Sequence, residues 1–372
     1  SISSTRTRLS RPYVARAPSA RKKLKTRATA TSPPTPIVFQ SSGLQPDLRL
    51  VVFDQEFHVH SVLLKIYSAF FRKFLDSPDK ETAIEAASTG ALPARLKFST
   101  PTKFKYEWVT KLDNDAESTD EGNWHLVAAS STLKEPIDLS AYKGDKEYQS
   151  RAFEKLLYAM YLKPYKIESC MELMTMTELA DYYCALPVLS RTLDGAFLRS
   201  PAFVGSIRDL CCETLALATK LRNSTLFRES LVWVLGPWGE ERWETLEDPK
   251  LKKIAKLARH ELSHKISKVQ EAIISIIEFA GGEDNSLIRE SALEAREDNG
   301  GYLNMPRYFQ KLCKREAIHV FMEDCGESLD MLMISNLVLE QHRAGKGFAD
   351  GHFLCVSIDD EDLPWDITEM DW

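Results

Sequence analysis

The chain has 372 residues, of which 44% are hydrophobic and 27% are charged, and these proportions are ordinary for a globular protein of two or three domains. It contains no run of about 18 apolar residues, so the sequence predicts no membrane-spanning helix and no membrane partner. The formal net charge of −6 is uneven, because residues 1–36 carry nine basic side chains and no acidic one.

Residues 1–43 are rich in Ser, Thr, Arg, Ala and Pro and have no hydrophobic period, so we predict a disordered basic arm. Its cluster RKKLKTR, residues 21–27, is typical of a nuclear import signal or a nucleic-acid patch. An Arg- and Ser-rich, acid-free segment also fits an organelle transit peptide. The third interpretation is a solvated tail that carries no targeting signal. We do not expect nucleic acid as the main partner.

Residues 47–75, DLRLVVFDQEFHVHSVLLKIYSAFFRKFL, carry the clearest pattern in the chain. Within them, 47–53 and 56–60 alternate between apolar and polar side chains, and this period of two predicts paired strands. Ser61 and Ser68 then stand where the N-caps of two short helices are expected. The stretch therefore predicts strand, turn, strand and two short helices.

This order of residues resembles the opening of a BTB/POZ domain. The family pattern has an Asp before an apolar strand, a second strand ending in Phe-x-Val-His, a Leu four residues on, and then Ser-x-Phe-Phe. The matching positions are Asp47, Phe57, Val59, His60, Leu64, Ser68, Phe70 and Phe71. The chain departs from the pattern at Ser61, where many members carry a basic residue.

The resemblance extends to two later helical segments, AFEKLLYAMYLKPYKIE and ELADYYCALPVL, and so covers residues 44–200. It implies an α+β protein-interaction domain rather than a catalyst. It also implies that His60 is a hydrogen-bonded structural residue near Asp47. We expect no catalytic, cofactor or metal site in this domain.

Residues 78–147 are longer than the corresponding connection in most BTB domains and are expected to be an insertion. Alternating side chains in 104–112 and 124–128 predict a β-hairpin closed over 113–122, and 95–98 is a further strand candidate. The long connection resembles the extended BTB region of proteins from filamentous fungi. The hairpin is either a recognition surface or an extension of the sheet that covers the core.

Residues 201–345 show helical periodicity and predict an all-helical C-terminal domain, with a long helix over 248–280 and a later one over 328–343. The remainder, 346–372, is expected to contain a short strand at 353–358 and an acidic tail.

The tail, 357–372, holds seven acidic and no basic side chains together with Trp365 and Trp372. Our hypothesis is that it folds back onto the basic arm or occupies a binding groove until a partner displaces it.

One catalytic motif occurs, the H-E-x-x-H of His260, Glu261 and His264. Two such histidines can hold Zn²⁺ while the Glu activates bound water. The apolar stripe of this helix, however, leaves both imidazoles on the solvent side, and Arg259 and Lys265 flank them. A zinc metallopeptidase is therefore a remote alternative.

The seven cysteines lack C-x-x-C spacing and predict reduced thiols in an intracellular protein of the nucleus or cytoplasm. The expected function is that of an adaptor or scaffold for protein partners, without enzyme activity or cofactor. The resemblance implies a homodimer, or a substrate receptor bound to the cullin scaffold of a ubiquitin ligase. A nuclear regulatory scaffold is the alternative.

Overall fold

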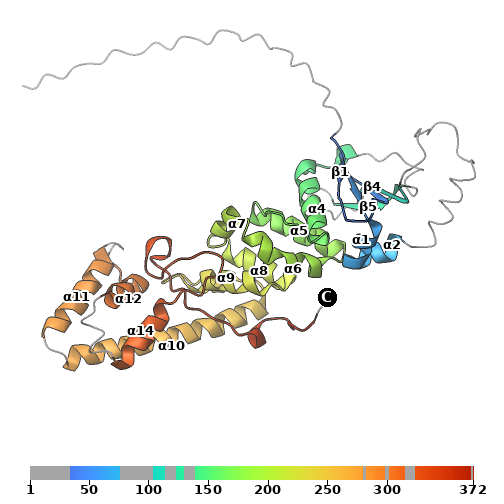
Figure 1. Cartoon of the computed structure of the whole chain (residues 1–372). Helices are drawn as coiled ribbons and strands as arrows, with labels where there is room; N and C mark the ends of the chain where they lie inside the picture. Colours follow the sequence, from blue (N-terminus) through green and yellow to red (C-terminus); the bar gives the residue numbers. More distant parts are fainter. Residues whose placement is uncertain are drawn as a thin grey trace, which may run out of the picture. The chain divides into compact units, whose positions relative to one another are not determined.

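The computed structural model describes residues 34–75, 104–113, 123–129, 139–279, 282–297, 301–314, 323–369 and 372. The basic cluster at 21–27, the strand candidate at 95–98 and most of the predicted hairpin turn lie outside these residues. Residues 35–372 form one compact unit. In its described part the unit is a mixed α+β structure, mostly helical, with a five-stranded sheet and twelve α-helices (Figure 1).

The strands are β1 (Ile37–Val38), β2 (Leu48–Val52), β3 (Gln55–Val59), β4 (Tyr106–Leu112) and β5 (Trp124–Ala128), in the spatial order β1-β3-β2-β4-β5. The antiparallel pair β2 and β3 is the predicted one. β4 and β5 are also antiparallel, with Val109 opposite Val127, which confirms the predicted pairing of the hairpin strands. Because β4 runs parallel to β2, β4 and β5 extend the sheet formed by β2 and β3.

The predicted boundary of the basic arm at residue 43 is too late. Ile37 and Val38 form β1, parallel to β3, and Phe39 is buried against the rings of Tyr158 and Tyr161 at 5.2 and 4.8 Å. Three apolar residues behind a proline-rich run are too few to show a period. Ile37 and Val38 are ordered by pairing with β3, and Phe39 is ordered by packing on rings that lie more than a hundred positions later.

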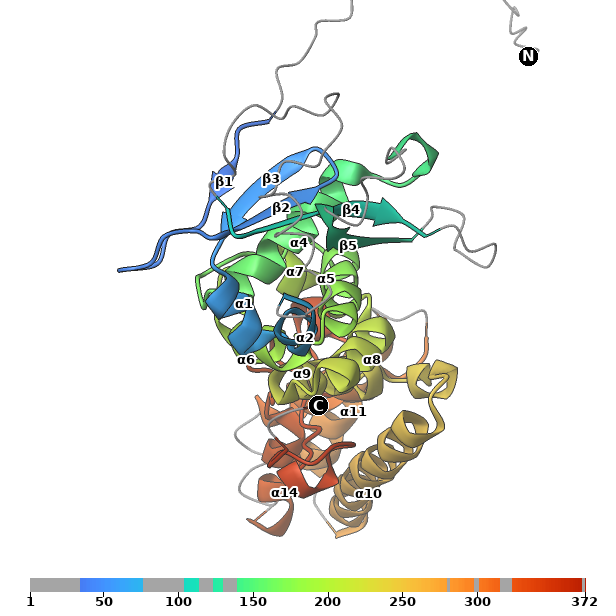
Figure 2. The ribbon, with the colours of Figure 1, turned by 90° about the vertical axis from the view of Figure 1, so that its right-hand side faces the viewer.

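Helices cover one face of the sheet (Figure 2). They are α1 (Ser61–Tyr67), α2 (Ala69–Leu75), α4 (Lys146–Met160) and α5 (Cys170–Tyr182). The side chains that point at them from β2 and β3, such as Leu50 and Phe57, are fully buried, and the Phe57 ring lies 6.0 Å from that of Phe153 on α4. Each such burial stabilises the fold by about 1.5–3 kcal/mol.

The remaining helices are α6 (Leu186–Phe197), α7 (Pro201–Ser206), α8 (Cys211–Leu221), α9 (Ser224–Leu235), α10 (Pro249–Phe279), α11 (Gly282–Glu297), α12 (Met305–Cys313) and α14 (Glu323–Met333). α8 packs on α5 and α6, α9 on α8 and α10, and α14 on α10. The helical region thus continues the stack of helices that starts at the sheet. The expected long helix is confirmed as α10. None of the described helices is both long and apolar enough to cross a membrane.

Two expectations for the C-terminal region are wrong. The helix predicted over 328–343 ends at Met333, and 353–358 is extended without joining a strand ladder. Buried Glu229 on α9 instead accepts the backbone N–H groups of Val338 and Leu339, at 2.7 and 3.2 Å. Asn336 donates its backbone N–H to Leu354 O at 2.9 Å and its side-chain N–H to Val356 O at 3.0 Å. These long-range partners satisfy groups that a helix or a ladder would have used.

Glu229 gives this attachment a pH dependence. Burial raises the pKa of its carboxyl above the usual 4.5, although the two backbone N–H groups oppose the shift. The folded state therefore binds this proton more readily than the unfolded chain, and the contribution of Glu229 to the free energy of unfolding falls as pH rises above 4.5.

We expect Glu229→Gln, which keeps an acceptor oxygen but cannot ionise, to lose this pH dependence and to be at least as stable as the wild type at neutral pH. Urea unfolding of both proteins between about pH 4 and pH 8 measures the difference. Glu178→Gln, at an exposed position of α5, is the control. A Gln variant that is clearly less stable at pH 8 would contradict the argument.

Candidate functional site

The eight residues of the BTB-like pattern lie together where β2, β3, α1 and α2 meet. The structure buries the apolar side chains Phe57, Val59, Leu64 and Phe71 completely and Phe70 in part. The polar members, Asp47, His60 and Ser68, each hold one junction between elements. The pattern therefore describes anchors of the fold, and a binding surface has to be sought among the residues that these anchors position.

Asp47 connects the sheet to α1. Its carboxylate oxygens accept the backbone N–H of Ser61 at 2.7 Å and the Ser61 hydroxyl at 2.6 Å. Its own N–H goes to Val59 O at 3.1 Å, and its carbonyl accepts the N–H of Tyr106 at 3.1 Å. The expectation that Ser61 caps α1 is wrong by one residue, because His60 occupies the N-cap and the Ser61 side chain is engaged with Asp47.

His60 is hydrogen-bonded, but its partner is Tyr161 at the end of α4. The Tyr161 oxygen lies 2.7 Å from both the backbone N and Nδ1 of His60. Burial raises the pKa of Tyr161, so the phenol is neutral. Its oxygen accepts the backbone N–H of His60 and also lies within hydrogen-bond distance of Nδ1. Ser61 is thus the residue that bonds to Asp47, whereas its neighbour His60 connects β3 to the end of α4.

Ser68 caps α2, as the sequence predicts. Its hydroxyl accepts the N–H of Phe71 at 3.1 Å and donates to Tyr183 O at 2.5 Å. The Phe71 and Tyr183 rings stack with centroids 5.4 Å apart and 5° between their planes, and the Tyr183 hydroxyl accepts Leu126 N–H of β5 at 3.1 Å. α2 is thereby fixed to α5 and to the far edge of the sheet.

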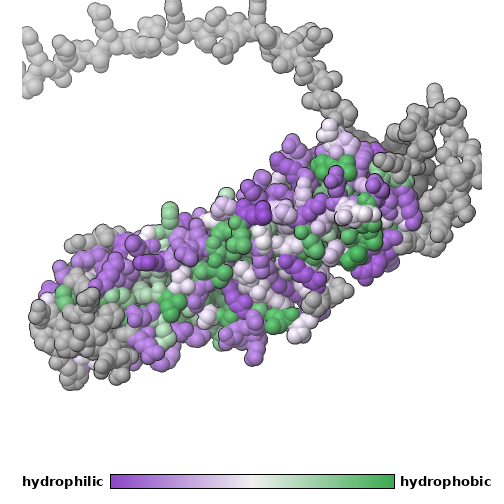
Figure 3. Space-filling view, viewed as in Figure 1, coloured by the Kyte–Doolittle hydropathy of each residue, from purple (hydrophilic) through white to green (hydrophobic). Residues whose placement is uncertain are grey.

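These anchors leave an apolar surface exposed, which we call the α1–α2 face: Val62, Ile66 and Phe74, with exposed fractions of 46, 55 and 39%. Val62 and Ile66 are four residues apart and share one side of α1. Arg72 Nε donates to Lys65 O at 3.1 Å and ties the two helices together. Figure 3 shows hydrophobic side chains gathered where Figure 1 labels α1. Exposed apolar groups on a fixed frame are typical of a protein-contact surface.

The H-E-x-x-H motif lies on α10. His260 and His264 are both exposed, which confirms the solvent-side position expected from the apolar stripe, and Glu261 lies 3.7 Å from Lys265. Within the described ranges, no three potential metal ligands come together.

A pair of thiols is the chemistry that sequence reasoning missed. Cys211 and Cys212 form the first turn of α8, where Arg242 donates to the Cys211 sulfur at 3.8 Å. The hydrogen bond from the Cys211 thiol lowers the pKa of Cys212 below its usual value. Two adjacent cysteines at a helix start were the available signal. Six of the cysteines are free thiols, as predicted: Cys170, Cys184, Cys211, Cys212, Cys313 and Cys355.

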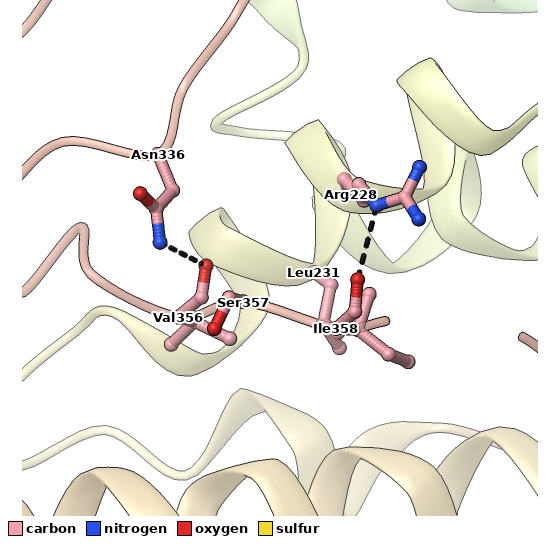
Figure 4. A pocket seen from close by; sticks show the side chains of 6 residues that line it. All are labelled: Arg228, Leu231, Asn336, Val356, Ser357 and Ile358. Atoms are coloured by element: carbon pink, nitrogen blue, oxygen red, sulfur yellow. Dashed lines mark hydrogen bonds between the residues drawn. The ribbon is translucent and has the colours of Figure 1, made fainter. Parts of the chain in front are cut away.

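A cleft of about 240 Å³ lies between α9 and the C-terminal segment. It is lined by Arg228, Leu231, Asn336, Val356, Ser357 and Ile358 (Figure 4). Its volume is below the roughly 300–1,000 Å³ of pockets that enclose small molecules, so we do not regard it as a substrate site.

No family model, curated protein or solved structure matches this chain. The α1–α2 face is the candidate site because it exposes apolar side chains on two anchored helices.

The anchor that carries this face can be tested at Asp47. We expect Asp47→Ala to lower the free energy of unfolding by about 1–3 kcal/mol, because the N–H and hydroxyl of Ser61 lose their acceptor. Urea unfolding measures the change. Asp54→Ala, at an exposed turn residue, is the matched control, and equal effects of the two substitutions would contradict the role of Asp47.

Proposed function

We propose that this protein is a protein-interaction adaptor or scaffold whose N-terminal region acts as a BTB/POZ domain. The observation that carries the proposal is the α1–α2 face, an exposed apolar surface held by the anchors that match the family pattern. Asp47, His60 and Ser68 each make buried or half-buried hydrogen bonds at one end of the two helices. Polar residues in these places support an interaction domain, because they fix the two helices while the exposed side chains between them can contact a partner.

The chemistry of the face favours another protein surface as the ligand. Its centre is aliphatic and aromatic, and basic Arg72 and Lys73 lie exposed at its edge. A second copy of the chain is the first partner to consider, since a two-fold interface uses each apolar residue twice. The cullin scaffold of a ubiquitin ligase is the second partner, and its binding would make the protein a substrate receptor.

Size-exclusion chromatography with light scattering on the full chain, alone and mixed with the N-terminal domain of a cullin, tests the proposal. We expect a dimer, a stoichiometric cullin complex, or both. Ile66→Glu should abolish the association, because it places a charge in the apolar contact.

Ile274→Glu on α10 is the matched control, because Ile274 and Ile66 are the same residue type and are both 55% exposed. It should leave the association intact. A chain that stays monomeric and does not bind the cullin domain would contradict both homodimerisation and cullin binding. Equal effects of the two substitutions would show that the α1–α2 face is not the interface.

A further inference from the structure

The C-terminal segment lies against α8 and α9, a surface with a composition unlike that of the α1–α2 face. Figure 1 shows this segment, in red, passing α9 on its way to the C-terminus. Arg228 donates to Ile358 O at 3.1 Å and pairs with Asp360 at 2.5 Å. Arg222 pairs with Glu369 at 2.6 Å. Two basic side chains thus contact an acidic segment at two separate places.

Aromatic contacts accompany the ion pairs. The Trp365 ring meets the fully buried Phe227 edge to face, with centroids 5.4 Å apart. The guanidinium of Arg222 lies 4.9 Å from the centre of the Trp372 ring. Each arginine therefore has an acidic partner, and each tryptophan has a partner on the α8–α9 surface. We call Arg222, Phe227 and Arg228 the α8–α9 groove.

The tight corner between α8 and α9 determines where the backbone of the groove residues lies. Arg222 ends α8 in the left-handed region, with φ of +49°. Asn223, which follows, caps α9 by accepting the N–H of Leu226 at 2.8 Å. The tight turn places Arg222 beside the first two turns of α9, which carry Phe227 and Arg228. The backbone that carries the three binding groups is therefore held by α8 and α9 themselves.

The attachment changes in character at Ile358. Before it, Phe353 and Leu354 are fully buried and Asn336 holds the backbone. After it, the backbone hydrogen bonds of the described residues close local turns, as between Asp362 N and Asp359 O, and side chains hold the segment to the helices. Asp360 and Glu369 are 60 and 48% exposed, and such ion pairs contribute only about 0–1 kcal/mol each.

We propose that the α8–α9 groove is a docking site for acidic, tryptophan-containing segments of partner proteins, and that the C-terminal segment occupies it as a ligand in cis through Asp360, Trp365, Glu369 and Trp372. The ligand chemistry follows from the bound tail, which combines acidic groups for the two arginines with indole rings for Phe227 and Arg222. A partner segment of the same chemistry displaces the tail. The groove is formed by other elements than the α1–α2 face, so this proposal goes beyond the adaptor function and does not depend on it.

The tethered tail and a free peptide compete for the same groove. A tethered segment acts at an effective concentration on the order of millimolar, so for an intrinsic dissociation constant on the order of 0.1 mM it weakens binding of a free peptide about tenfold. Exposed ion pairs are screened beyond about 8 Å at physiological salt. Added salt should therefore weaken the docking.

The experiment uses a fluorescent peptide of residues 357–372 and the full chain, with binding read by anisotropy. In the tail-released variant Asp360→Ala, Trp365→Ala, Glu369→Ala the tail loses both ion pairs and the contact with Phe227, and we expect this protein to bind the peptide about ten times more tightly than the wild type. Adding Arg222→Glu and Arg228→Glu to that variant should abolish binding. A peptide with Asp360→Arg and Glu369→Arg should restore it, which also shows that the charge-reversed protein is folded.

Two results would overturn the whole proposal, and a third would overturn the assignment of the ligand to partner proteins. One is equal, weak binding of the peptide by the wild type and by the tail-released variant. The other is equal binding of a peptide in which Trp365 and Trp372 are alanine and all seven acids remain, because this would show a nonspecific attraction between charges. If the wild type forms dimers that Arg222→Glu and Arg228→Glu abolish, the occupant is the tail of a second copy, and the assignment to partner proteins is wrong.

Discussion

The hydrogen bonds of Asp47 are the constraint on which the sheet and the first two helices both depend. Its backbone joins β3 and β4 on either side of β2, through Val59 and Tyr106. Its carboxylate then holds Ser61, the second residue after β3. A shift of β3 by one residue would turn its buried side chains to the opposite face and would also move Ser61 away from Asp47. Apolar packing and polar anchoring therefore select the same register.

This register determines how rigid the α1–α2 face is. α1 starts at His60, which is held by Tyr161, and α2 starts at Ser68, which is held by Tyr183. Each short helix has seven residues, too few to be stable alone, so its position comes from these contacts rather than from its own propensity. A surface fixed in this way loses little conformational entropy on binding. The exposed Ile66 is thus presented in a geometry that a partner does not have to induce.

Sequence patterns were sufficient where the interacting residues are close in the chain. The β2–β3 pair, the Ser68 cap and α10 all follow from local period or capping chemistry. Patterns failed where a distant group decides the local conformation. The stretch 334–343 has a helical period, but Glu229 takes two of its backbone N–H groups. β1 has only two residues and depends on β3, and no pattern in β4 reveals that it runs parallel to β2.

The candidate sites also differ in how far they could be predicted, according to whether nearby or distant residues determine them. All eight pattern residues could be found from the sequence because they are anchors with defined spacing. The α1–α2 face could not, since exposure of Val62 or Ile66 depends on what the other helices leave uncovered. The α8–α9 groove joins Arg222 to Glu369 across 147 positions. The sequence indicated an acidic tail that could fill a groove, while only the fold indicates the groove.

Both surfaces are locally basic on a chain whose net charge is −6, and this contrast favours selective binding. The overall negative charge repels acidic ligands in general, whereas Arg222 and Arg228 attract them only within a Debye length of about 8 Å. A ligand must then supply an apolar contact as well, because exposed ion pairs alone contribute too little to hold it. The tail meets both requirements through Glu369 and Trp365. Charge therefore limits which segments approach the groove, and the aromatic contact decides which of them stay.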